Sequence, residues 1–125
     1  RLDLSTCTMG LAGLKHLANA LKCNISLRAL SLANNNLNEA GAEHLVADII
    51  IVNKCLLEID LSGNLLGGVF DVDHDWCPTP EKVMVVIANA LRYSTRWERC
   101  DLRENGLTKW QRVKLVAEFS TRLLL

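Results

Sequence analysis

LRALSLANNNL (27–37) and LLEIDLSGNLL (56–66) are two copies of one pattern, L-x-x-L-x-L-x-x-N-x-L with Ile in one leucine position, and this pattern decides the fold. WERCDLRENGL (97–107) follows the same pattern with two substitutions. The opening RLDLSTCTM (1–9) is the same unit without its first two residues. Aligning the four units gives one landmark column: Cys7, Asn35, Asn64 and Asn105.

The second half of each unit also recurs. LANAL (17–21) is nearly identical to IANAL (87–91), and Gly13 and Gly41 fall at the same offset from the landmark. Within the pattern the leucines alternate, which predicts a short strand with one buried side. After the landmark the apolar residues recur every three or four positions, which predicts an amphipathic helix. Each unit is therefore expected to form one strand and one helix, and stacked units would bury both apolar faces.

The landmark residues lie where the chain turns away from each strand. An asparagine side chain can bond the backbone groups that such a turn leaves unpaired. In the run NNN (34–36), the register predicts that Asn35 points inward and that Asn34 and Asn36 are exposed.

Composition limits the function classes. The chain has 125 residues, of which half are apolar and 22% are charged, as is ordinary for one globular domain. Fourteen basic and fourteen acidic side chains cancel, so we expect no general affinity for nucleic acid or for a membrane surface. The five cysteines have no close CxxC spacing, which favours reduced thiols in a cytoplasmic protein.

The aligned units resemble the leucine-rich repeats of the ribonuclease-inhibitor-like class, whose units have 28 or 29 residues. LRALSLANNNLNEAGAEHL (27–45) is similar to repeats of NOD-like immune receptors, Ran GTPase-activating proteins and several cytoskeletal and axonemal proteins. The resemblance implies an α/β leucine-rich-repeat solenoid of about four repeats, one domain over 1–125, with a curved parallel sheet inside and helices outside. It also implies a module that binds a protein partner on the concave strand face.

The last unit departs from this pattern. Trp97 and Cys100 replace leucines, which indicates an altered terminal layer. A capping helix is expected near 108–123, with Thr108 as its N-cap. It would close the open end of the stack with an apolar stripe made of Trp110, Val113, Val116 and Ala117. The final LLL is expected to pack on the last unit or to lead into further sequence.

The third unit carries an insertion near 69–80, within LLGGVFDVDHDWCPTPE (65–81). The first three ligand positions of a calcium-binding EF-hand loop are matched by Asp71, Asp73 and Asp75. The match then fails, because Trp76 replaces the required glycine and Lys82 replaces the bidentate glutamate.

Zinc is no better supported in this insertion. His74 and Cys77 are possible ligands, but a closed zinc site needs four. We therefore expect no metal there. Two interpretations stay open: a plain polar loop with Phe70 and Trp76 packed on the helical side, or a partner-binding loop that uses Asp73 and Trp76.

The strand pattern predicts which side chains share the concave face. The central column is Asp3, Ser31, Asp60 and Asp101. Its neighbours are Arg1, Ala29, Glu58 and Arg99 on one side and Ser5, Ala33, Ser62 and Arg103 on the other. A partner of complementary charge would bind the third and fourth units through Glu58, Asp60, Arg99, Asp101, Arg103 and Glu104. The alternative is a solvated face whose charges neutralise one another.

Three functions follow as hypotheses. The first is a protein-interaction module that uses the concave face, the insertion or both. The second is a structural subunit of a large cytoskeletal or ciliary complex, because the array is short and the insertion suits fixed docking. The third, from resemblance alone, is a GTPase-activating protein. The sequence has no G-x-S-x-G motif and no glycine-rich phosphate loop, so we expect neither an enzyme nor a cofactor.

Overall fold

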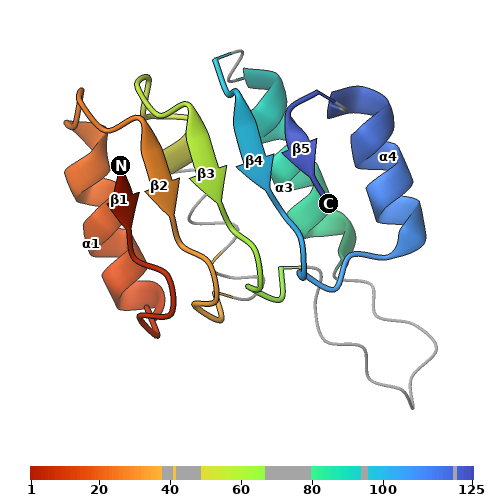
Figure 1. The fold of residues 1–125 in the computed structure, drawn as a ribbon, viewed down its shortest axis with the longest axis horizontal. Helices are drawn as coiled ribbons and strands as arrows, with labels where there is room; N and C mark the ends of the chain where they lie inside the picture. Colours follow the sequence, from red (N-terminus) through yellow and green to blue (C-terminus); the bar gives the residue numbers. More distant parts are fainter. Residues whose placement is uncertain (38–40, 42–48, 67–79, 94–95, 120) are drawn as a thin grey trace.

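A computed structural model describes residues 1–37, 41, 49–66, 80–93, 96–119 and 121–125. These residues contain five short strands and three helices: β1 (Leu2–Asp3), α1 (Leu11–Lys22), β2 (Ala29–Ser31), β3 (Glu58–Asp60), α3 (Pro80–Tyr93), β4 (Arg99–Asp101), α4 (Lys109–Phe119) and β5 (Leu123–Leu124). The strands form one sheet in the order β1-β2-β3-β4-β5, and each neighbouring pair is parallel (Figure 1).

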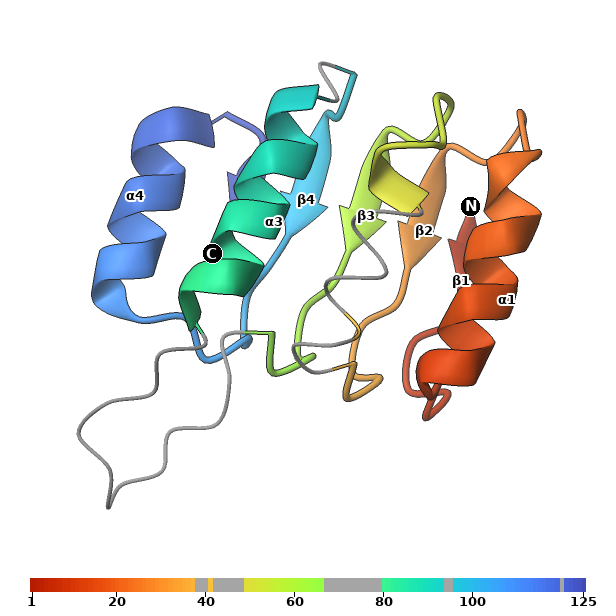
Figure 2. The same ribbon diagram turned by 180° about the vertical axis from the view of Figure 1, so that it is seen from behind.

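The sheet and the helices form two layers. The helices α1, α3 and α4 lie on the same face of the sheet, as the front and back views show (Figures 1 and 2). The edge strands β1 and β5 hold the two ends of the chain, and the sheet is not closed. The predicted α/β class and the predicted parallel sheet are confirmed.

The alternating leucines build the core between the two layers. The three central strands and the residues just after them turn one side toward the helices, and those side chains are almost fully buried: Leu30, Leu32, Ile59, Leu61, Cys100 and Leu102. The leucines of the edge strands are partly buried. Trp97 is also only 2% exposed, and its indole nitrogen has no hydrogen-bond partner among the described residues. Burying one leucine or isoleucine side chain stabilises a fold by about 1.5–3 kcal/mol, so the buried strand positions carry much of the stability.

The landmark residues sit in turns that share one backbone conformation. In all four turns the residues on both sides of the landmark have a positive φ. The pairs are Thr6 and Thr8, Asn34 and Asn36, Gly63 and Leu65, and Glu104 and Gly106. Gly63 is required for a second reason: a Cβ there would lie 2.0 Å from Oδ1 of Asn34 in the neighbouring turn. Successive turns are therefore in close contact.

Asparagine side chains join each turn to the one before it. Asn64 is fully buried, and its Oδ1 accepts hydrogen bonds from the backbone N–H groups of Asn35 (2.9 Å) and Leu37 (3.3 Å). Its Nδ2 donates to the carbonyl oxygens of Leu32 (2.8 Å) and Leu61 (3.0 Å). Asn35 and Asn105 bond in the same way, so the prediction that the landmark side chains satisfy turn backbone is confirmed.

The cap of α4 agrees with the sequence. Thr108 precedes the helix, and its Oγ1 accepts a hydrogen bond from the N–H of Gln111 (3.2 Å). In return, Oε1 of Gln111 accepts from the N–H of Thr108 (2.7 Å). This reciprocal pair is a capping box.

The prediction of which face of α4 packs on the stack was wrong. Trp110, Val113, Val116 and Ala117 are exposed, and the residues that pack against the core are Gln111, Leu115 and Phe119. The helix ends at Phe119, whereas we expected a helix near 108–123. Leu123 and Leu124 instead form β5 beside β4, so the final leucines do pack on the last unit.

The insertion near 69–80 lies outside the described residues except for Pro80, which begins α3 as expected. The predictions for Asp73 and Trp76, and for the metal candidates Asp71, His74, Asp75 and Cys77, fall on this undescribed part.

Candidate functional site on the open face of the sheet

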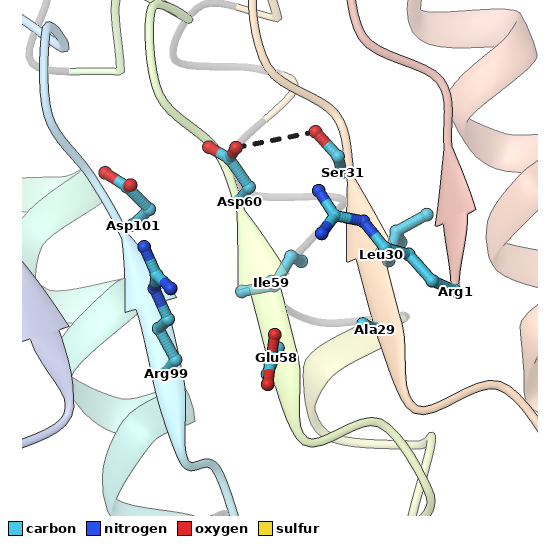
Figure 3. Close-up of a pocket in the computed structure, with 9 residues that line it drawn as sticks. All are labelled: Arg1, Ala29, Leu30, Ser31, Glu58, Ile59, Asp60, Arg99 and Asp101. Carbon is cyan, nitrogen blue, oxygen red and sulfur yellow. Dashed lines mark hydrogen bonds between the residues drawn. The ribbon is translucent and has the colours of Figure 1, made fainter.

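The face of the sheet opposite the helices, here called the open face, carries the charged columns expected from the sequence. Strand pairing places Ala29, Glu58 and Arg99 side by side, and likewise Ser31, Asp60 and Asp101. Between them lies a shallow polar depression of about 150 Å³ (Figure 3). Its polar lining residues are Arg1, Ser31, Glu58, Asp60, Arg99 and Asp101. Four of the eight predicted site residues therefore meet in one place.

Asp101 is held in place by Arg103, two residues later in the chain. Its carboxylate is 3% exposed and accepts hydrogen bonds from Nε (3.0 Å) and Nη2 (2.7 Å) of Arg103. The backbone N–H of Arg103 donates to the same carboxylate (3.1 Å). Burial raises the pKa of Asp101, but the hydrogen bonds and charge of Arg103, with the nearby charge of Arg99, outweigh burial and lower the pKa. Asp101 is therefore ionised, and the guanidinium of Arg103 neutralises its negative charge.

Arg103 is the partner of this carboxylate. The hydrogen bond to Asp101 raises the pKa of Arg103, and the guanidinium covers the carboxylate. It is not among the residues that line the depression, and neither is the exposed Glu104, which belongs to the next turn. These two predicted partner-binding residues thus lie outside the lining of the depression, and their binding role stays a prediction.

Glu58 and Arg99 are an exposed pair of opposite charges on this face. They stand directly opposite each other on β3 and β4, and both side chains are exposed. Neither makes a side-chain hydrogen bond or a salt bridge with another residue of the described ranges. Arg99 points along β4 toward Asp101 (Figure 3), where its charge contributes to the low pKa of that carboxyl group.

Asp60 forms the centre of the depression. Its Oδ1 accepts hydrogen bonds from the backbone N–H (3.0 Å) and the hydroxyl (2.7 Å) of Ser62. Its Oδ2 faces Ser31 across the strand gap, at the long distance of 3.5 Å from the hydroxyl oxygen. The Arg1 side chain extends over β2 toward β3 (Figure 3). One carboxylate oxygen of Asp60 is therefore only weakly bonded by the described residues and can accept from a ligand.

Two contributors were not selected from the sequence. Arg1 and Ser31 line the depression, and their column positions were the signal that could have identified them. Leu124 of β5 pairs with Asp101 and extends the central column by one apolar residue. β5 lies outside the four units that were aligned on the landmark column, so the column rule did not include it.

Within the described ranges, no group of three or more His, Cys, Asp or Glu side chains could hold a metal ion. No helix in the same part of the chain is long and apolar enough to cross a membrane. No protein-family model and no curated protein matches the chain.

Proposed function

We propose that the chain is a leucine-rich-repeat solenoid of the ribonuclease-inhibitor-like class and that it binds a protein partner on its open face. The fold part of the proposal is supported by the recurring turn conformation, the asparagine bonds between turns and the sequential parallel strands. In stacked repeats of this kind, the strand face is an extended binding surface.

The observation that carries the binding proposal is the exposed, opposed pair of Glu58 and Arg99. Two opposite charges held on neighbouring strands fix the orientation of a ligand that carries both a cation and an anion. With Asp60 two residues after Glu58 on β3, the depression suits a lysine or arginine side chain of the partner. An acidic residue of the same partner would meet Arg99.

The volume of the depression agrees with a side chain as ligand. A space of about 150 Å³ holds one long side chain, whereas pockets for small molecules usually measure about 300–1,000 Å³. The remaining affinity would come from the surrounding strand face, which exposes polar side chains along several strands.

Charge substitution with affinity capture tests the proposal. Wild-type protein and the Arg99→Glu variant are used to capture binding proteins from native extract at low and at high salt. Lys15→Glu is the matched control, because Lys15 is exposed on α1 and the charge change is identical. Arg103→Glu is avoided, since it would place a second carboxylate against the buried Asp101 and destabilise the fold.

The expected result is one salt-sensitive partner that Arg99→Glu loses and Lys15→Glu keeps. A set of many assembly proteins that survives high salt and ignores Arg99→Glu would contradict the proposal. That result would favour the structural-subunit alternative instead.

A further inference from the structure

A second concave surface lies on the opposite side of the molecule, between the parallel helices α3 and α4. This groove has a volume of about 180 Å³. Its floor and apolar wall come from Val85 and Ala88 of α3 and from Trp110 and Leu115 of α4. The helices lie side by side in the view from behind (Figure 2). None of these residues takes part in the open-face site.

The groove exposes apolar surface that the fold does not use. Val85 is 56% exposed and Trp110 is 57% exposed, and on α4 the neighbouring Val113 and Val116 are also exposed. On α1, by contrast, only Leu11 is an exposed large apolar side chain, at 39%. Of the apolar stripe that the sequence suggested as a packing surface, Trp110 therefore lines this groove, and the other members are exposed to solvent.

The two ends of the groove differ in charge. Arg92 and Glu118 form an ion pair at the C-terminal end of the two helices, and Nη2 of Arg92 lies 2.9 Å from Oε2 of Glu118. At the other end, Lys114 lies over the Trp110 ring, with Nζ 4.5 Å from the ring centroid. Because Arg92 and Glu118 pair with each other, Lys114 is the remaining charge among the residues that line the groove. Lys109 and Arg112 are further exposed basic residues of α4 outside this lining.

We propose that this groove docks an amphipathic helix of a protein partner that carries acidic residues beside its apolar anchors. A groove between two parallel helices accepts a third helix by inserting its anchors at i, i+3 or i+4. Trp110 is exposed in this apolar lining, and tryptophan is among the residues most enriched at binding hot spots. Acidic flanking residues match the basic side chains of α4, which selects an acidic helix over a basic one.

The test selects ligands from a displayed library of helix-forming peptides of about 16 residues, a length at which helices begin to be stable in water. The library fixes apolar residues at helical spacing and randomises the flanking positions. Selected peptides are synthesised, and their dissociation constants are measured against the whole chain and its variants. Trp110→Ala and Lys114→Glu probe the groove. Ile25→Ala, at a residue that is 79% exposed outside the groove, is the control.

The expected peptides are rich in glutamate and aspartate beside their apolar positions. Trp110→Ala should weaken binding by about tenfold or more, as removal of a hot-spot tryptophan does. Lys114→Glu should also weaken binding, whereas Ile25→Ala should not change it. In the wild type, the indole N–H resonance of Trp110 should shift on binding, while that of the buried Trp97 should not. Both groove variants alter exposed side chains, so unchanged unfolding midpoints would verify that they remain folded.

Four outcomes would overturn the proposal. The first is a selection without acidic helical peptides, and the second is binding that Trp110→Ala leaves intact. The third is self-association of the chain that Trp110→Ala abolishes, which would assign the groove to a second copy. The fourth is Trp110-dependent binding to phosphatidylcholine–phosphatidylserine vesicles without peptide binding. The Arg99→Glu variant separates the two sites, since it should leave peptide affinity unchanged even if the open-face proposal fails.

Discussion

At the scale of single residues, the landmark asparagines hold neighbouring turns together. A buried asparagine side chain can bond two N–H groups and two or three carbonyl groups at once, and Asn64 does so. Aspartate offers no N–H donor and leucine offers no polar group, so neither can replace it. Cys7 is the landmark of the first turn, whose flanking residues also have a positive φ, but it is exposed and its thiol donates locally, to the carbonyl of Ser5.

Substituting Asn64 with alanine should therefore be severe. The variant leaves the N–H groups of Asn35 and Leu37 and several carbonyls without this partner, and each buried unsatisfied group costs about 1–3 kcal/mol. We expect a loss of about 2–4 kcal/mol in the free energy of unfolding, measured with urea. Asn19→Ala, on the exposed face of α1, should change it by less than about 0.5 kcal/mol. Equal effects of the two variants would refute the structural role of the asparagine hydrogen bonds between turns.

The cysteines should differ sharply in reactivity. Burial, with the charges of Asp101 and Asp60, raises the pKa of the Cys100 thiol to about 12, whereas Cys7 and Cys23 are exposed. At pH 8, iodoacetamide should label Cys7 and Cys23 in the folded protein and reach Cys100 only after unfolding, as peptide mass spectrometry can show. Because the folded state favours the neutral thiol, stability should fall as the pH rises above about 9. Rapid labelling of Cys100 in the native state would contradict this assignment.

At the scale of elements, α4 shows why the sequence predicts a helix better than its orientation. The sequence contains two apolar stripes, and the pattern favoured the one with Trp110 and two valines. The buried stripe contains Gln111, which reads as polar, yet its side-chain oxygen is used by the capping box with Thr108. The capping signal T-x-x-Q was present in the sequence. Only the position of the sheet and of α3 decides between the stripes.

The two faces of α4 should respond differently to truncation. Phe119 is 4% exposed, so Phe119→Ala should destabilise the protein by about 3–5 kcal/mol. Val113 is 61% exposed, so Val113→Ala should change the free energy of unfolding by less than about 0.5 kcal/mol. Thermal or urea unfolding of both variants shows which face of α4 is packed. A larger loss of stability for Val113→Ala than for Phe119→Ala would support the stripe that the sequence favoured.

At the scale of the whole molecule, the spacing from the landmark predicted the strand register. Ser31, Asp60 and Asp101 each stand four residues before their asparagine, and the structure pairs them as neighbours. The columns therefore identified most of the open-face site from sequence. The internal pairing of Asp101 with Arg103 could not be predicted, because it depends on the side-chain path of a flexible arginine. The groove between α3 and α4 was missed, since it arises only when two helices from different units lie together.

The open-face site is tested most directly by the affinity of the captured partner, measured by calorimetry at two salt concentrations. We predict that Arg99→Glu weakens binding by about tenfold or more at low salt, that high salt weakens wild-type binding, and that Lys15→Glu has no effect. The double variant Glu58→Arg/Arg99→Glu, which reverses the pair but keeps the net charge, should also bind poorly, because orientation matters. Wild-type affinity in both Arg99 variants would show that the partner does not bind at this face.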